Sequence, residues 1–310
     1  MLEIFKTVDG GLTRLENFEY GIWVNLTNPS EEELKLVCES LDVAPEYVRA
    51  ALDEEERPRI EYEDGQTLII VDIPLIEKDG NSNVYATIPL GIITCKESII
   101  TVCLYDNNII KDFTNKRIKS FFTFYKNRFI LQILFKIATH YLLYLRHIDK
   151  ISSRVESDLQ KSMKNKELLQ LLRLEKSLVY FSTSLKSNEI VLEKMLKLEY
   201  IKKFPDDMEL LDDVIIENKQ ALEMANIYSS ILSGMMDAFA SIISNNVNIV
   251  MKFLTSVTIV MAIPTMVASF FGMNVHIPFQ NSPHAFYIVI AISIALSSIS
   301  TYFLIKKKLF

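Results

Sequence analysis

Apolar residues divide the chain into a mixed first part and two long uncharged runs near the end. The runs are residues 253–271 and 285–305, and neither contains Asp, Glu, Lys or Arg. About 20 such residues are enough for a helix to cross a membrane. Two buried helices of a soluble protein are the alternative, but soluble helices of this length rarely lack a polar face. We therefore predict two transmembrane helices.

Basic residues beside the two runs predict the orientation of these helices. Lys252 precedes the first run, Lys306–Lys308 follow the second in a short tail, residues 306–310, and residues 272–284 between the runs contain no Lys or Arg. Because basic residues concentrate on the cytoplasmic side, both termini should be cytoplasmic. Residues 272–284 should form an outer loop of a multi-pass protein in the inner or plasma membrane. The terminal lysines would contact lipid headgroups or form a basic collar at the inner mouth of a pore.

Residues 1–112 have the pattern of a cytoplasmic α/β domain. Asn28-Pro29-Ser30-Glu31 predicts the start of a helix, with Asn28 as the N-cap and Pro29 in the first helical position. Turn-forming residues at Lys78-Asp79-Gly80-Asn81 predict a hairpin between the first two of three strands. The apolar, β-branched runs that predict these strands are residues 67–73, 84–94 and 98–104.

Residues 113–204 contain no Pro or Gly and are rich in Leu and Lys, which predicts long cytoplasmic helices. Pro205 can open a further helix, and Gly234 is the only Gly or Pro between it and Pro264. As a single helix, residues 205–271 would extend roughly 100 Å at about 1.5 Å per residue and would include the first transmembrane segment. A helix of this length needs neighbours to support it, so we expect an oligomer.

A polar stripe follows one face of this long helix in alternating steps of four and three residues. Such a repeat marks a seam that faces a partner or a symmetry axis. Hydroxyl and amide groups within a membrane face water or one another, and rings of oxygen atoms suit Mg²⁺, which sheds its water reluctantly. Eight of the ten positions are polar. The stripe, which we predict to line a pore, consists of Asp237, Ser241, Ser244, Asn248, Met251, Thr255, Thr258, Ala262, Thr265 and Ser269.

Two features of the stripe have a second interpretation. Its Ser and Thr hydroxyls can bond to carbonyl groups of their own helix or join two helices. Met251, with Leu254 one turn further on, can form a hydrophobic ring that closes a pore by excluding water, or can be ordinary core packing. The sequence leaves both pairs of alternatives open.

The first transmembrane segment ends at Phe271 and is followed at once by Gly272-Met273-Asn274. This tripeptide, Pro264-Thr265 upstream and Lys306–Lys308 at the end of the chain together resemble the CorA family of magnesium channels. Residues 52–59 and 87–93 look like parts of the N-terminal domain of that family. The resemblance extends over the whole chain.

This resemblance implies a funnel-shaped homopentamer, in which five long helices line the pore and the second transmembrane helices lie outside them. Gly272, Met273 and Asn274 would form the outer selectivity filter, where the Asn274 side-chain oxygen and the Gly272 carbonyl receive a hydrated ion. The resemblance also matches Thr265, Asn248 and Asp237 to pore positions further in, and Met251 and Leu254 to the hydrophobic constriction.

A regulatory Mg²⁺ site follows from the same resemblance. Asp213 matches the acidic position on the long helix where cytoplasmic Mg²⁺ binds between subunits, and we assign Asp72 as the carboxylate that it faces. Crowded carboxylates repel and gain from a bridging cation, so abundant Mg²⁺ would hold a closed state and scarcity would open the pore. A solvated helix face is the alternative for most of these residues. The acidic residues between 205 and 247 are Asp206, Asp207, Glu209, Asp212, Asp213, Glu217, Glu223 and Asp237, against Lys219 alone.

Three positions depart from the family pattern. Phe271 stands where Tyr is usual, Ser269 stands where Gly is common, and the outer loop has His276, Gln280 and Asn281 in place of acidic residues. The first two changes should leave the pore intact. The third leaves open how strongly cations are concentrated outside the pore, and with it the ion preference.

We therefore predict a channel for Mg²⁺, and also for Co²⁺ or Ni²⁺, driven by the membrane potential. A transporter of the same superfamily that prefers Zn²⁺ is one alternative, and a non-conducting membrane-anchored scaffold is another. The expected partners are copies of the same chain, membrane lipids and divalent cations. A formal net charge of −6 argues against nucleic acid, and we find no paired base and nucleophile that would indicate an enzyme.

Overall fold

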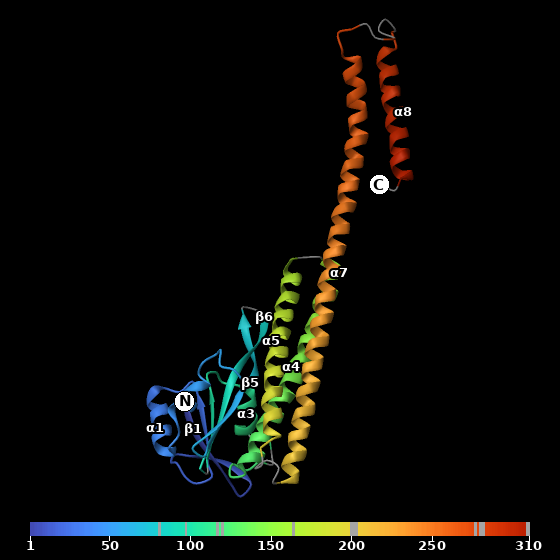
Figure 1. Cartoon of the computed structure of the whole chain (residues 1–310). Coiled ribbons are helices and arrows are strands. Elements are labelled where there is room, and N and C mark those ends of the chain that lie inside the picture. The colour runs from blue at the N-terminus through green and yellow to red at the C-terminus, as the bar shows by residue number, and fades with distance from the viewer. Residues whose placement is uncertain are drawn as a thin grey trace. The chain divides into compact units, whose positions relative to one another are not determined.

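The computed structural model describes residues 1–79, 82–96, 98–115, 118, 121–162, 165–198, 204–275, 278 and 283–307. The chain forms two compact units, Met1–Gly234 and Met235–Phe310. Helix α7, Pro205–Phe271, contributes to both (Figure 1). The predicted fold class is confirmed, because an α/β domain is followed by long helices and by two helices of membrane-spanning length.

A seven-stranded sheet forms the centre of the first unit, with the strand order β2-β1-β3-β7-β6-β5-β4. Neighbouring strands are antiparallel except β3 and β7, which are parallel. The register of β5 and β6 runs from Thr67 opposite Thr94 to Asp79 opposite Ser82, which confirms the predicted hairpin, although Gly80-Asn81 lie outside the described residues. The strands are β1 (Leu2–Val8), β2 (Gly11–Leu15), β3 (Trp23–Thr27), β4 (Arg59–Glu63), β5 (Gln66–Asp79), β6 (Ser82–Cys95) and β7 (Ser98–Cys103).

Two short helices, α1 (Glu31–Leu41) and α2 (Pro45–Ala50), cover one face of the sheet. Gly91 in β6 makes this close packing possible. A Cβ added at Gly91 would lie 2.8 Å from the Cβ of Ala51, directly after α2, so any side chain there would push the helix away from the sheet.

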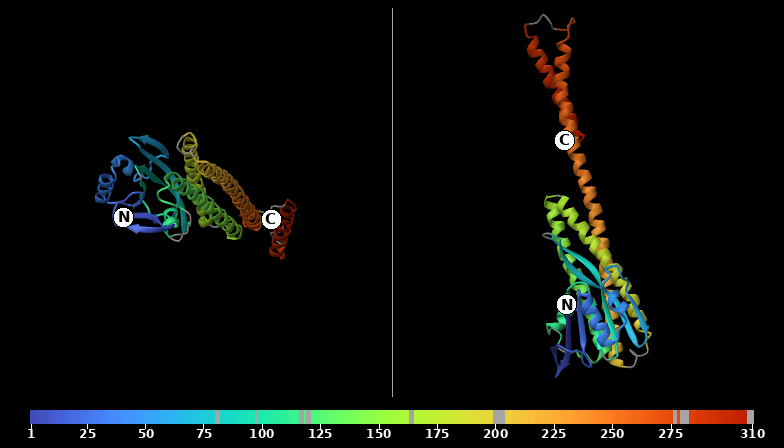
Figure 2. Two further views of the ribbon diagram at one scale, coloured as in Figure 1. Left: turned by 90° about the horizontal axis from the view of Figure 1, so that it is seen from below. Right: turned by 90° about the vertical axis from the view of Figure 1, so that its left-hand side faces the viewer.

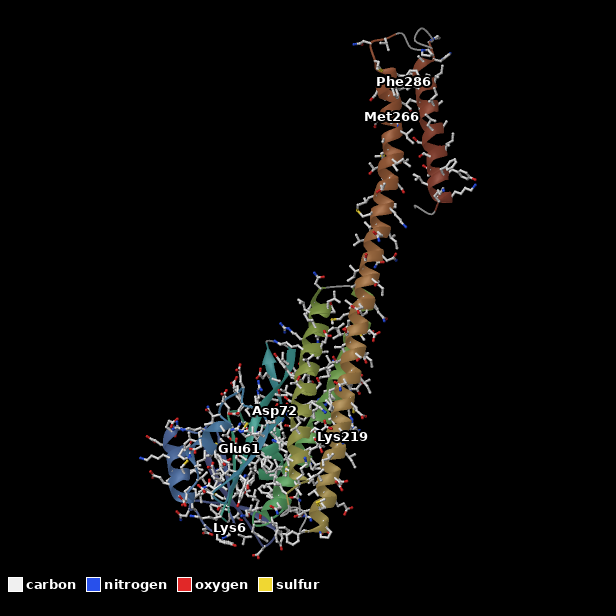
Figure 3. The ribbon with its side chains drawn as sticks, in the orientation of Figure 1. Lys6, Glu61, Asp72, Lys219, Met266 and Phe286 are labelled. Carbon is white, nitrogen blue, oxygen red and sulfur yellow. The ribbon has the colours of Figure 1, made fainter. Side chains whose placement is uncertain are left out.

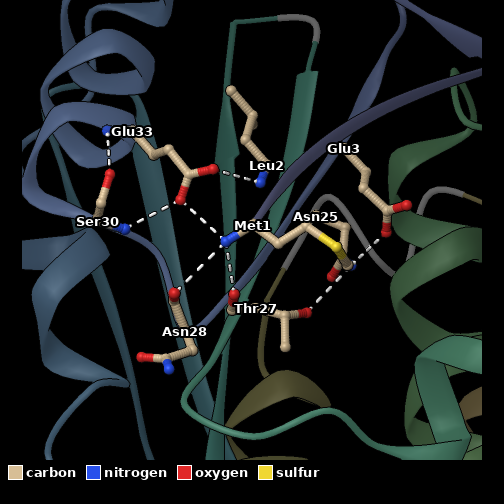
Figure 4. A network of polar contacts seen from close by, with 8 residues as sticks. All are labelled: Met1, Leu2, Glu3, Asn25, Thr27, Asn28, Ser30 and Glu33. Atoms are coloured by element: carbon tan, nitrogen blue, oxygen red, sulfur yellow. Dashed lines mark hydrogen bonds and ion pairs between the residues drawn. The ribbon is translucent and has the colours of Figure 1, made fainter.

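Helix α1 begins two residues later than the sequence pattern predicted. Its N-cap is Ser30 rather than Asn28, because Ser30 and Glu33 form a reciprocal capping box. The Glu33 N–H donates to Ser30 Oγ at 3.2 Å, and the Ser30 N–H donates to Glu33 Oε2 at 2.9 Å. The Glu33 carboxylate also accepts the Leu2 N–H at 2.8 Å and the Met1 ammonium at 2.9 Å, so it joins α1 to β1 (Figure 4).

The other face of the sheet is covered by α3 (Asn108–Thr114), α4 (Lys126–Ser162) and α5 (Asn165–Met195), and α7 lies on α4 and α5 (Figure 2). An aromatic cluster fills this layer around Trp23, whose ring centroid lies 5.1 Å from those of Phe5 and Phe129. The first part of α7 is packed into the same core, since Leu211 and Val214 are buried there.

The second unit consists of the remainder of α7 and of α8, Ala285–Lys306. Both helices are long and apolar enough to cross a membrane, and no residue of α8 is buried within the chain. On α7, Ser256 and Val267 are among the few buried side chains, with exposed fractions of 2% and 8%. The large apolar surface that remains needs lipid or other copies of the chain to cover it.

Candidate ion path and regulatory site

All ten side chains of the polar stripe are exposed in the single chain. Ser256 and Val267, which are buried, lie roughly 140° around the helix from the centre of the stripe, at about 100° per residue. The apolar residues beside the stripe are exposed as well, among them Val250 and Phe253. The stripe is therefore exposed in the single chain, although Leu304 of α8 lines a pocket together with Asn248, Met251 and Thr255.

Two threonines of the stripe bond to their own helix. Thr258 Oγ1 donates to the carbonyl of Leu254 at 2.8 Å, and Thr265 Oγ1 donates to that of Met261 at 3.3 Å. One of the two interpretations of these hydroxyls is thus realised in the single chain. A hydroxyl that donates its proton in this way still has lone pairs with which its oxygen can accept a hydrogen bond from water.

Met251 and Leu254 project from the chain rather than into its core. Their exposed fractions are 57% and 53%, so neither side chain packs in the core of a single chain. The two positions lie roughly 60° apart around the helix, which places both on or beside the stripe.

Helix α7 ends where the Gly-Met-Asn tripeptide begins. The Gly272 N–H donates to the carbonyls of Ala268 at 2.9 Å and Ser269 at 3.3 Å, which closes the last turn. A Cβ on Gly272 would lie 3.2 Å from the Ala268 carbonyl oxygen, so glycine suits this tight turn. Met273 and Asn274 follow and are exposed. The predicted loop residues His276, Gln280 and Asn281 lie outside the described residues.

Asp213 lies on the exposed side of α7, as do its neighbours Asp212 and Ile216. Among the described residues, no group of three or more His, Cys, Asp or Glu side chains could hold a metal ion.

Asp72 is held inside its own chain, between β5 and the helices α4 and α5 (Figure 3). Its backbone N–H donates to Asn188 Oδ1 and its carbonyl accepts from Asn188 Nδ2, both at 2.8 Å, and Tyr141 donates to the same carbonyl at 3.1 Å. Burial raises the pKa of the Asp72 carboxyl to about 6, although a hydrogen bond with Ser184 acts to lower it. The carboxylate is partly buried and has a polar partner within its own chain, and its role as a metal ligand stays a prediction.

A family model described as "CorA-like Mg2+ transporter protein" matches residues 18–307. The chain belongs to this family. Its two helices of spanning length are accordingly the membrane part of a divalent-cation transporter.

Two curated relatives and one solved structure agree with this assignment to the CorA-like family. The cobalt/magnesium transport protein CorA of Methanocaldococcus jannaschii is 29% identical over 91% of this chain and 89% of its own length. The protein of the same name from Thermotoga maritima is 24% identical over 98% of this chain and 88% of its own. The complete structure of the Methanocaldococcus jannaschii CorA magnesium transporter superposes with a TM-score of 0.85 and 26% identity, covering 98% of this chain and 97% of that one.

The sequence analysis did not identify one buried acid in this CorA-like chain, Glu189. Glu189 of α5 is 8% exposed, and its carboxylate lies 2.6 Å from Lys186 Nζ and 4.0 Å from Lys219 Nζ on α7. Lys219, the one base in the acidic part of α7, thus has a partner on α5. The spacing Leu178-Leu185-Glu189, which places the acid on the apolar face of α5, was the available signal.

Proposed function

We propose that copies of this chain surround a common axis with the polar stripe of α7 facing inward, and that Mg²⁺ passes along this stripe into the cytoplasm. The observation that carries the proposal is the difference in burial between two sides of α7. The side of α7 with Ser256 and Val267 is buried within the chain, and all ten stripe residues are exposed. The homopentamer implied by the family resemblance would repeat each of these residues as a ring.

The chemistry of the stripe suits a hydrated cation. Mg²⁺ keeps several of its waters, so it is best served by oxygen atoms that accept hydrogen bonds from those waters. Thr258 and Thr265 already donate their protons to their own helix, and their oxygen lone pairs are left for this purpose. At the outer end, the Asn274 oxygen and the Gly272 carbonyl would meet the hydrated ion first.

Inward flux needs no chemical energy in this proposal. A divalent cation gains about 4.6 kcal/mol on crossing a potential of about 100 mV, negative inside, which is twice the value for a single charge. Rings of Met251 and Leu254 would oppose this flux when the pore is closed, because a narrow apolar ring excludes water.

Regulation would act through Asp213 on the cytoplasmic part of α7. Bound Mg²⁺ would bridge carboxylates of neighbouring copies and stabilise the closed state, which it can do only if it binds that state more tightly. The exposed position of Asp213 and the lack of a complete metal site among the described residues of one chain both support a site shared between copies.

Mg²⁺ flux into liposomes that contain the purified full-length protein tests the function. We expect Asn274→Ala to reduce potential-driven Mg²⁺ uptake at least tenfold. Asn226→Ala, a change at an exposed residue of α7 outside the span, should leave uptake unchanged. Competition by Co²⁺, Ni²⁺ and Zn²⁺ in the same assay ranks the ions. If Asn274→Ala left uptake unchanged, the proposed role of Asn274 in the selectivity filter would be wrong. If the wild type showed no uptake, the chain would be better explained as a non-conducting scaffold.

A further inference from the structure

A groove runs along the membrane part of the second unit, between α7 and α8. Its volume is about 920 Å³, and Val260, Pro264 and Ala268 line it from α7. Along α8 it extends from Phe286 to Ile305. At about 1.5 Å per residue this is nearly the full thickness of the hydrocarbon core, about 30 Å. The groove is therefore long enough to hold acyl chains of lipid.

The direction in which the groove faces, relative to the stripe, indicates whether lipid or a second copy of the chain occupies it. The four α7 residues that line the groove, Val260, Met261, Pro264 and Ala268, point on average roughly 115° away from the centre of the stripe over Thr258–Ser269, at about 100° per residue. If the stripe faces the axis of a ring, neighbouring copies flank the stripe, and a surface turned this far from the axis faces outward. This step rests on the proposed function, because it uses the proposed direction of the stripe.

Positive charge at one end of the groove indicates that the lipid headgroup there is negatively charged. Lys306 and Lys307 are exposed and follow Ile305 directly. At the opposite end of α8, Phe286 and Tyr287 form the kind of aromatic anchor that lies at a membrane interface (Figure 3 labels Phe286). The helix is thus fixed between an aromatic end and a basic end, and the basic end lies where an inner-leaflet phosphate would be.

We propose that this groove is a binding site for an anionic phospholipid of the inner leaflet. One acyl chain lies in the half of the groove that ends at Ile305, beside Ser298 and Thr301, and the phosphate group contacts Lys306 and Lys307. The apolar groove selects for an acyl chain and the two ammonium groups select for negative charge. The site thus differs from a general attraction of basic residues to the membrane surface.

Lipid binding to the full-length assembly, followed by native mass spectrometry, tests the proposal. The probes are palmitoyl-oleoyl phosphatidylglycerol and the phosphatidylcholine with the same chains. The double variant Lys306→Gln/Lys307→Gln should lower the affinity for phosphatidylglycerol about thirtyfold, because each lysine contributes about 1 kcal/mol of binding free energy. The affinity for phosphatidylcholine should not change. Lys252→Gln is the matched control, because Lys252 is an exposed lysine of α7 that lines a different pocket, and it should have no effect.

The groove itself is tested by filling it. Ser298→Phe should lower the binding of both lipids, and Ser298→Ala should change neither. An equal loss with Lys252→Gln would show a general surface charge effect, and unaltered binding with Ser298→Phe would show that no chain lies in the groove. If Ser298→Cys formed cross-links between copies that the wild type does not form, a second copy of the chain would lie in the groove. Each of these outcomes overturns the lipid site. Mg²⁺ uptake, measured on the same preparations with Asn274→Ala, tests the pore separately.

Discussion

At the scale of single residues, Asp72 shows how surroundings change the chemistry of a carboxylate. Strand β4 begins at Arg59 opposite Ile70, so β5 has no strand partner on that side at Asp72. The Asn188 side chain supplies both missing backbone hydrogen bonds. An acid within an apolar strand was visible in the sequence, and we interpreted it as a metal ligand. The structure gives it interior partners, and a ligand role stays an untested prediction.

The raised pKa of Asp72 predicts a pH dependence of stability. Between its ordinary value of 3.8 and its folded value of about 6, the folded chain holds a proton that the unfolded chain has lost. Stability therefore falls as the pH rises through this window, by at most about 3 kcal/mol at about 1.36 kcal/mol per unit. Asp72→Asn removes this penalty, so the variant should gain stability over the wild type at pH 8 but not at pH 4.

Thermal unfolding of the full-length protein, followed by the fluorescence of Trp23, the single tryptophan, measures this difference. Asp212→Asn, at an exposed position on α7, is the control and should show no such dependence. If Asp72→Asn and the wild type differed in thermal stability by the same amount at pH 4 and pH 8, the pKa of Asp72 would not be raised.

At the scale of elements, the start of α1 depends on the Glu33 carboxylate, which accepts hydrogen bonds from three donors. Burial acts to raise the pKa of Glu33, but hydrogen bonds from the N-terminal ammonium and from the N–H groups of Ser30 and Leu2 outweigh it, and the pKa is lowered. The stabilisation is therefore present above the ordinary pKa of 4.5 and is lost as the pH falls through the lower folded value.

Two substitutions separate the contribution of the helix cap to stability from that of the other Glu33 contacts, with Met1 and Leu2. Ser30→Ala removes one half of the capping box and should cost about 1 kcal/mol. Glu33→Gln also weakens the contacts with Met1 and Leu2, and should cost more, about 2 kcal/mol at pH 7. The loss from Glu33→Gln should shrink below about pH 4 in urea unfolding measured by Trp23 fluorescence. Equal losses for both variants at all pH values would contradict the role of the charge.

At the scale of the whole molecule, the proposed function depends on contacts that one chain does not contain. The stripe is open in the single chain, and Asp213 lies on an exposed helix face. By contrast, the contact between Glu189 and Lys219 ties α7 to α5 within one chain. Interactions within the chain thus position α7, and its exposed faces are left for assembly.

The proposed shared site predicts a change in feedback. Asp213→Asn should weaken the inhibition of uptake by Mg²⁺ inside the liposomes at least fivefold, because one carboxylate of each bridge loses its charge. Asp212→Asn, one residue away and equally exposed, should retain wild-type inhibition. Uptake is measured over a series of internal Mg²⁺ concentrations. Identical inhibition curves for Asp213→Asn and the wild type would place the regulatory site elsewhere.

Much of this protein could be predicted from local patterns in its sequence. Uncharged runs, the lack of Pro and Gly over 113–204 and the spacing of Ser, Thr and Asn on α7 depend only on neighbours along a helix or strand. Such patterns determined the two spanning helices, the β5–β6 hairpin and the polar stripe. They also pointed to the family through Gly272-Met273-Asn274.

Contacts between distant residues were decided only by the tertiary structure. Ser30 became the N-cap because Glu33 also meets Met1 and Leu2 across the fold. The Asp72 backbone is paired because Asn188, 116 residues later, bonds to both its N–H and its carbonyl. The groove between α7 and α8 exists because two segments separated in sequence lie side by side. Burial and partner choice depend on which elements meet in space, and a local pattern does not contain that information.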